Sequence, residues 1–252
     1  MKLLENKVAV VTGGARGIGK AIALAFADEG AHVIITDIQL EGAAEETKAL
    51  LQSKGVKASA YKSDVREFAG TQTIIDQVAQ EYQRVDILVN NAGVTRDALL
   101  MRMTEEEWDL VLDTNLKGTF NYCRAVSKYM VGQRQGKIIN ISSNISQVLQ
   151  PLRGVYAVTK AGVSHLTRVM ALEWAPHHLN VNAIAPAPTM TDLNKPYFAA
   201  HPDDLEKRLQ SIPLGRLGTP GDYLGAAIFL ASQASDFVTG QTLFVDGGSN
   251  LI

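Results

Sequence analysis

Short runs of apolar, often β-branched residues alternate along the chain with longer stretches in which apolar residues recur at helical spacing. Apolar runs of this kind are typical of strands that are buried on both faces of a parallel sheet. The alternation therefore predicts an α/β fold of the Rossmann type, a doubly wound parallel sheet of about seven strands with helices on both faces. The predicted strands cover 8–11, 32–36, 58–62, 86–90, 137–143 and 242–245, and the predicted helices include 41–54, 67–83, 104–131 and 221–232.

At 252 residues the chain has the length of one α/β domain, and we expect a single dinucleotide-binding and catalytic domain over 1–252. The formal charge of -2 gives no electrostatic reason to expect a nucleic acid or an anionic membrane as a partner. No apolar run approaches the ~20 residues of a membrane span, and the start lacks a signal peptide, so we expect a cytoplasmic protein. Cys123 is the only cysteine, which excludes an internal disulfide and a cysteine-rich zinc site, and no metal is expected.

A glycine-rich turn joins the first predicted strand to a helix. Its spacing is G-x-x-x-G-x-G, with Gly13, Gly17 and Gly19, and it also contains Arg16 and Ile18. Glycines let the backbone approach a pyrophosphate, and the following helix N-terminus offers free N–H groups and a positive dipole end. The turn therefore predicts a dinucleotide site, with a purely structural glycine turn as the alternative.

Acidic residues follow the second and third predicted strands. Asp37 suits a hydrogen bond to the adenosine ribose hydroxyls, and its charge would repel a 2′-phosphate, so it favours NAD(H) over NADP(H). Arg16 points the other way, since a guanidinium in the turn could meet a phosphate. Asp64 could hydrogen-bond the adenine amino group, or it could be the N-cap of the next helix. We expect NAD as the cofactor, with NADP less favoured.

Lys160 lies four residues after Tyr156, so both side chains leave the same face of a helix. An ammonium group beside a phenol stabilises the phenolate, and we expect it to lower the tyrosine pKa from ~10 toward neutrality, where acid–base catalysis is efficient. A solvated surface pair is the alternative. Ser143 ends the fifth predicted strand, upstream of this helix. Asn115 interrupts the helix predicted over 104–131, which indicates a kink or a polar role.

These motifs, in this order, resemble the short-chain dehydrogenase/reductase family over the whole chain. The resemblance rests on TGGARGIG, NNAG, Asn115, the ISS strand end, YAVTK and TGQTLFVDGG, and it is greatest toward 3-oxoacyl-carrier-protein reductases and secondary-alcohol dehydrogenases. It implies a catalytic set of Asn115, Ser143, Tyr156 and Lys160, and a homotetramer. The implied cofactor contacts are Gly13, Arg16, Gly17, Ile18, Gly19, Asp37, Asp64, Val65, Asn91, Ala92, Gly93, Tyr156, Lys160, Pro186, Thr189 and Thr191.

One segment departs from the family pattern. Where the family usually has glycine, this chain has Ala187 followed by Pro188, which stiffens the loop and disfavours positive φ, so the local geometry is in doubt. The resemblance makes 190–214 a substrate lid, with Tyr197, Phe198 and His201 as candidate substrate contacts or core-facing aromatics.

The expected function is an NAD(H)-dependent oxidoreductase that interconverts a small-molecule secondary alcohol and a ketone, with Tyr156 as the general acid and base. One alternative is an NADPH-dependent 3-oxoacyl-carrier-protein reductase of fatty-acid synthesis, and another is a non-catalytic nucleotide-binding scaffold. A serine hydrolase is set aside, because the chain contains no G-x-S-x-G elbow.

Overall fold

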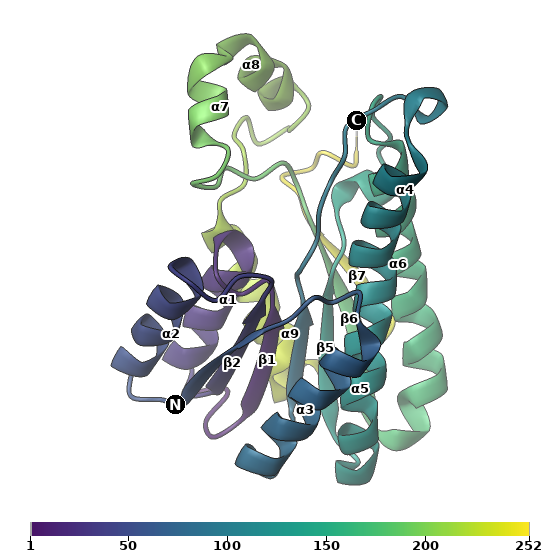
Figure 1. The fold of residues 1–252 in the computed structure, drawn as a ribbon. Helices are drawn as coiled ribbons and strands as arrows, with labels where there is room; N and C mark the ends of the chain where they lie inside the picture. The colour runs from purple at the N-terminus through teal and green to yellow at the C-terminus, as the bar shows by residue number, and fades with distance from the viewer. Residues whose placement is uncertain (1, 252) are drawn as a thin grey trace.

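A computed structural model describes residues 2–251 of the protein, which form a seven-stranded sheet in the order β3-β2-β1-β4-β5-β6-β7 (Figure 1). All neighbouring strands are parallel. The strand order reverses between β1 and β4, which is the topological switch point where ligands bind in such sheets. The predicted fold class is confirmed. The strands are β1 (Val8–Thr12), β2 (His32–Asp37), β3 (Ala58–Lys62), β4 (Ile87–Asn90), β5 (Gly136–Ile141), β6 (Leu179–Pro186) and β7 (Thr242–Val245).

Helices cover both faces of this sheet (Figure 1). One face carries α1 (Gly17–Asp28), α2 (Ala43–Ser53) and α9 (Leu224–Ala231), and the other carries α3 (Phe68–Tyr82), α5 (Gly118–Gln133) and α6 (Gly154–Trp174). Two short helices, α7 (Lys195–Ala200) and α8 (Pro202–Gln210), stand above the carboxyl ends of the strands. Among residues 2–251, no helix has the length and apolarity that crossing a membrane requires.

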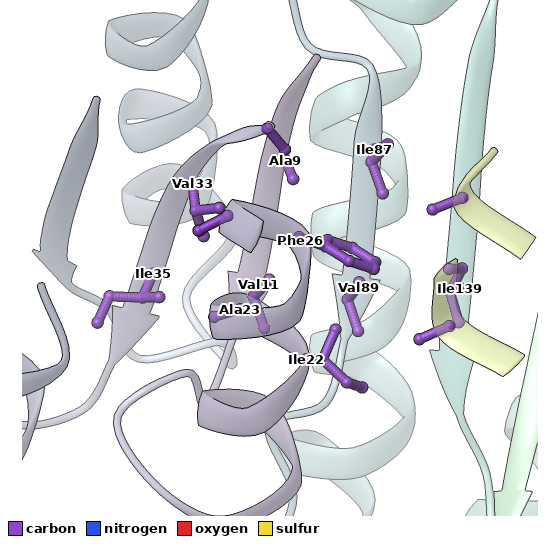
Figure 2. Packing of buried hydrophobic residues seen from close by; sticks show 14 of the residues in the cluster. Ala9, Val11, Ile22, Ala23, Phe26, Val33, Ile35, Ile87, Val89 and Ile139 are labelled. Carbon is purple, nitrogen blue, oxygen red and sulfur yellow. The ribbon is translucent and has the colours of Figure 1, made fainter. Parts of the chain in front are cut away.

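The core on the α1 side positions the glycine turn. Figure 2 shows Ile22, Ala23 and Phe26 of α1 facing apolar side chains of the strands, among them Val11 and Val89. All five side chains are fully buried. Burying a side chain such as isoleucine or phenylalanine stabilises a fold by roughly 1.5–3 kcal/mol. This packing holds the start of α1, and with it the glycine turn, at the carboxyl end of β1.

The helix predicted over 104–131 is two helices. The first, α4 (Glu105–Leu112), starts with a capping box between Thr104 and Glu107, as the sequence predicts. A π-helical turn over Asp113–Lys117 then leads into α5. The turn inserts an extra residue into the helical path, a feature frequent at functional sites. The helical stretch predicted over 104–131 and its interruption at Asn115 are both confirmed, and the buried Asn115 side chain bonds to groups outside the helix.

Candidate active site

A cleft of about 450 Å³ opens at the carboxyl ends of the strands, beneath α7 and α8. Strand β5 ends at Ile141, two residues before Ser143, which lines one wall of the cleft. The first two turns of α6 supply Tyr156 and Lys160, which line it as well. Of the four residues in the catalytic set implied by the resemblance, Ser143, Tyr156 and Lys160 therefore line the same cleft.

The side chain of Lys160, in α6, is buried and reaches the end of β5. Its ammonium nitrogen donates to the carbonyl of Ile141 at 2.7 Å and lies 5.6 Å from the centroid of the Tyr156 ring. Burial lowers the pKa of Lys160 to about 8, because a charged amine loses its hydration there.

The expectation that Lys160 lowers the pKa of Tyr156 is wrong in this structure. Burial of the phenol raises its pKa, and this outweighs the smaller lowering effects of the Ser143 hydroxyl and the Arg153 charge. The Lys160 ammonium points to a backbone carbonyl and not to the phenol oxygen. Tyr156 therefore stays protonated at neutral pH, which suits a group that donates a proton.

Asn115 does not line the cleft, and its amide ties two segments together behind it. Its Oδ1 accepts from the backbone N–H of Val94 at 2.8 Å, and its Nδ2 donates to the Val94 carbonyl at 2.9 Å. The same Nδ2 donates to the Thr159 hydroxyl at 3.1 Å, which in turn donates to the carbonyl of Tyr156. Asn115 thus holds the residue next to Lys160. No sequence pattern singled out Thr159.

The glycine turn packs closely against the end of β4. Gly13 and Gly17 have φ values of 60° and 56°, which favour glycine. A Cβ on Gly19 would lie 2.3 Å from the carbonyl oxygen of Gly13 and 2.5 Å from Nδ2 of Asn91. That Nδ2 donates to the carbonyls of Thr12 and Gly13, so Asn91 anchors the turn.

A second cavity, of about 290 Å³, lies on the other side of Asn91. Asn91, Gly93 and Val94 line both cavities, so the two form one crevice across the switch point between β1 and β4. Of the predicted cofactor residues, the second cavity is lined by Gly13, Asp37, Asp64, Val65, Asn91, Ala92 and Gly93, and the first by Ile18, Asn91, Gly93, Tyr156, Lys160, Pro186 and Thr189. Arg16 is exposed and lines neither cavity, and Thr191 lies beside Gly17 without lining either.

Two carboxylates are held at the wall of the second cavity. Asp37 accepts from the backbone N–H groups of Ala15 at 3.2 Å and Ile38 at 2.9 Å. Asp64 pairs with the Arg66 guanidinium, and that hydrogen-bonded pair lowers the pKa of Asp64. The N-cap of α3 is Glu67, so the alternative that Asp64 caps this helix is wrong. Arg66, which the sequence did not single out, also lines the cavity.

The loop after β6 keeps a regular geometry despite the departure at Ala187. The φ of Ala187 lies outside the left-handed region, so the position does not need glycine. Thr189 holds the loop in place through a β-bridge to Gly218 and a 2.5 Å hydrogen bond with the Tyr223 hydroxyl. The Ala187-Pro188 sequence therefore does not force the backbone of this loop into a strained conformation.

The helices α7 and α8 bring further side chains to the cleft. Tyr197 and Phe198 line it, as expected of two of the three aromatic candidates. His201 does not, because its exposed ring stacks on Tyr197 with centroids 4.3 Å apart. Two arginines missed by the sequence reasoning, Arg153 and Arg208, also line the cleft. The spacing of Arg153, three residues before Tyr156 and on the same helical face, could have identified it.

A phenol, an ammonium and a hydroxyl around one cleft can bind a carbonyl oxygen and pass it a proton. Within residues 2–251, no cluster of three or more His, Cys, Asp and Glu side chains forms a candidate metal site. The connected second cavity, with its glycine turn and its acidic wall, has the features of a dinucleotide site. The arrangement is therefore suited to hydride exchange with a carbonyl compound.

Comparison with known proteins agrees with this geometry. A family model described as enoyl-(acyl carrier protein) reductase matches residues 13–250. The 3-oxoacyl-(acyl-carrier-protein) reductase FabG of Thermotoga maritima is 44% identical over 246 residues, which cover 97% of this chain and 98% of that protein.

Two solved structures share the whole fold. A gluconate 5-dehydrogenase from Burkholderia cenocepacia, in complex with NADP and tartrate, is 39% identical with a TM-score of 0.92, covering 99% of this chain and 97% of the other. A short-chain type dehydrogenase/reductase from Mycobacterium marinum is 34% identical with a TM-score of 0.92 over the same shares of both chains. Sequence and structure thus resemble both reductases and dehydrogenases.

Proposed function

The chain belongs to the short-chain dehydrogenase/reductase family of oxidoreductases, and we propose that it reduces 3-oxoacyl thioesters to 3-hydroxyacyl thioesters with a nicotinamide dinucleotide as hydride donor. The observation that carries the proposal is the single crevice, in which Ser143, Tyr156 and Lys160 adjoin a cavity suited to adenosine. The 44% identity to a 3-oxoacyl-(acyl-carrier-protein) reductase supports this substrate class over the simple secondary alcohols expected at first.

The residues of the crevice fit a dinucleotide. The positive φ of Gly13 and Gly17 shapes the turn that leads into α1, and the N-terminus of that helix suits a pyrophosphate. Asp37 would hydrogen-bond the adenosine ribose hydroxyls, and Asp64 with the Val65 backbone would bind the adenine. When bound, the dinucleotide supplies the hydride.

The side chains around the cleft supply binding and proton handling. Ser143 donates a hydrogen bond to the substrate carbonyl oxygen, and Tyr156 donates a proton to that oxygen as the carbonyl is reduced. Lys160, held by the Ile141 carbonyl, would bind the nicotinamide ribose, and Asn115 acts through Thr159 to keep α6 in place. A positioned general acid contributes about 10²- to 10⁴-fold to a rate. The segment 190–214 acts as the lid that covers the substrate.

Cofactor choice depends on Asp37. Its fixed carboxylate at the cavity wall opposes a 2′-phosphate, which favours NADH. The comparisons do not support a preference for NAD, since the gluconate 5-dehydrogenase is in complex with NADP. We therefore propose that either dinucleotide can donate the hydride, and that Asp37 sets the ratio of kcat/KM for NADPH over that for NADH.

A second candidate function is the oxidation of a small secondary alcohol, as the sequence first suggested. The 39% identity to a gluconate 5-dehydrogenase and the acidic wall at Asp37 favour it. The two candidates share the cleft and the proton donor, and they differ in substrate and in the direction of hydride transfer.

Steady-state assays of the purified protein separate the candidates. Acetoacetyl-N-acetylcysteamine is offered with NADH and with NADPH, and gluconate is offered with the two oxidised cofactors. The proposal expects a higher kcat/KM for the thioester, and a drop of about 10²-fold or more in Tyr156→Phe at unchanged thermal stability. Turnover of gluconate alone would favour the second candidate. Turnover that persists in Tyr156→Phe would contradict the role given to the phenol.

A further inference from the structure

The active-site cleft carries three cationic side chains and, among the described residues that line it, no carboxylate. The cations are Lys160, Arg153 and Arg208. Lys160 has a place in the proposed proton transfer, whereas the two arginines have none. Like charges gathered in a cleft raise the local concentration of ligands of opposite charge. The positive charge of the two arginines therefore favours an anionic ligand in this cleft.

Arg153 lies at the start of α6, three residues before the proton donor Tyr156. Its Nη1 donates to the Thr95 hydroxyl at 3.1 Å, and its Nη2 lies 3.0 Å from an oxygen of Asp97. The side chain is 22% exposed. Arg153 and Tyr156 line the same cleft, and the charge of Arg153 is one of the influences that lower the pKa of Tyr156, below the larger effect of burial.

Arg208 reaches the same cleft from α8, on the lid side. Its guanidinium lies 6.0 Å from the centroid of the Phe198 ring, which lines the cleft beside it. Within residues 2–251, Arg208 has no carboxylate at ion-pair distance, unlike its neighbour Lys207, which lies near Asp204. A guanidinium with free N–H groups is suited to bind carboxylate or phosphate oxygens in pairs.

We propose that Arg153 and Arg208 bind an anionic group of the carbonyl substrate, carried as carboxylate or phosphate oxygens. This inference rests on the proposed function, because it names the substrate class of the same cleft. Two sources share this chemistry. One is the carboxylate of a free 3-oxo acid, and the other is the phosphate of a phosphopantetheine arm.

Asp97 competes with the substrate for Arg153. Its carboxylate is 46% exposed and pairs with only one side of the guanidinium. The Thr95 hydroxyl donates to Asp97 at 3.0 Å, and asparagine keeps an oxygen that can accept this bond, so Asp97→Asn removes the charge that holds Arg153 while retaining the acceptor for Thr95. The variants Asp97→Asn and Arg153→Gln should therefore shift anion recognition in opposite directions, which a merely structural ion pair would not do.

The test compares substrates with and without the negative charge. Acetoacetate is paired with neutral methyl acetoacetate, and acetoacetyl-phosphopantetheine is paired with neutral acetoacetyl-pantetheine, which lacks only the phosphate. For each pair the ratio of kcat/KM, anionic over neutral, is measured in the wild type and in each variant. Arg208→Gln and Arg153→Gln should each lower the ratio for one pair by about 10- to 100-fold, the value of a charge-assisted hydrogen bond. Asp97→Asn should raise that ratio severalfold.

Lys207→Gln is the matched control, because it removes one positive charge from the same helix without touching the cleft. Its ratio should stay within about twofold of the wild type. If the arginine variants lower the ratio for the acetoacetate pair, the bound anion is the carboxylate of a 3-oxo acid. If they lower the ratio for the phosphopantetheine pair, the bound anion is the phosphate. Ratios that the two arginine variants leave unchanged, or that Lys207→Gln lowers equally, would overturn the inference.

Failure of the proposed function gives a different pattern. If the wild type reduces none of the four compounds, the proposed activity fails, and calorimetric binding of acetoacetate and of acetoacetyl-phosphopantetheine then tests the anion site alone. Weaker binding of either anion in Arg208→Gln than in Lys207→Gln would support the site. Equal binding by both variants would rule it out.

Discussion

The side-chain amide of Asn144 donates a 2.9 Å hydrogen bond to the hydroxyl of Ser249, which lies 105 residues later in the chain. The Ser249 hydroxyl donates to Asp246 at 3.2 Å, and all three side chains are buried. On its other side, the Asn144 amide oxygen accepts from the Ser143 hydroxyl at 3.3 Å. The turn after β7 therefore holds the residue that adjoins Ser143 in the cleft.

Replacing Ser249 with alanine should impair turnover more than cofactor binding. The change leaves the buried Asn144 amide short of one acceptor, at a cost of about 1–3 kcal/mol, and it loosens the residue beside Ser143. We expect kcat for ketone reduction to fall severalfold, with the KM for the dinucleotide nearly unchanged. The exposed Ser53→Ala serves as the control. An unaltered kcat in Ser249→Ala would contradict the positioning role.

The burial of Lys160 should make stability depend on pH. Its pKa falls from 10.5 to about 8 in the folded protein, so between these values the unfolded chain binds a proton that the folded protein does not. Stability therefore rises with pH in this window, by about 3 kcal/mol in total, and the contribution is lost as pH falls through about 8.

Lys160→Met removes that contribution, so the unfolding free energy of the wild type relative to the variant should increase from about pH 7 to about pH 10. Urea denaturation at both pH values measures it, and the other titrating groups cancel in the difference. Parallel pH profiles for the two proteins would mean that Lys160 keeps its ordinary pKa.

Gly19→Ala should damage the dinucleotide site. The new Cβ would lie 2.3 Å from the Gly13 carbonyl oxygen, so the backbone of the turn must move. We expect a loss of affinity for NADH and NADPH of about tenfold or more, measured by fluorescence titration, with about 1–3 kcal/mol of destabilisation.

The control for Gly19→Ala is Gly132→Ala in α5, where a Cβ meets nothing within 4 Å. That change should stabilise the protein by about 0.5–1 kcal/mol and leave cofactor affinity unaltered. Tight binding by Gly19→Ala would show that the turn does not contact the cofactor.

Asp37→Ser should shift cofactor selectivity toward NADPH. Removing the carboxylate from the cavity wall removes its repulsion of a 2′-phosphate, so the ratio of kcat/KM for NADPH over NADH should rise about tenfold. Arg16→Gln should change the ratio little, because Arg16 lines neither cavity. The reverse result, with a large effect at Arg16 alone, would transfer the selectivity role to the glycine turn.

Much of the fold could be predicted because local patterns reflect it directly. The apolar run Val8–Thr12 is buried on both faces, as its composition indicates, and the glycine turn that follows leads into α1. The capping box at Thr104 and the interruption at Asn115 were likewise predictable, since each depends on the few residues around it. The homotetramer and the cytoplasmic location stay predictions.

Other predictions failed where distant groups decide the outcome. The pKa of Tyr156 follows from its burial between elements, which outweighs any local spacing to Lys160. The loop at Ala187 is held by Gly218 and Tyr223, so its geometry could not be judged from its own residues.

The sequence by itself determined which chemical groups stand at the ends of the strands and in what order, because strand periodicity and glycine turns are local properties of the chain. Only the tertiary structure decided which of them share a cleft. The two arginines, the lowered pKa of Lys160 and the bond from Asn144 to Ser249 all arise from packing between segments far apart in the chain. Burial and charge act through space, and residue spacing along the chain does not report those distances.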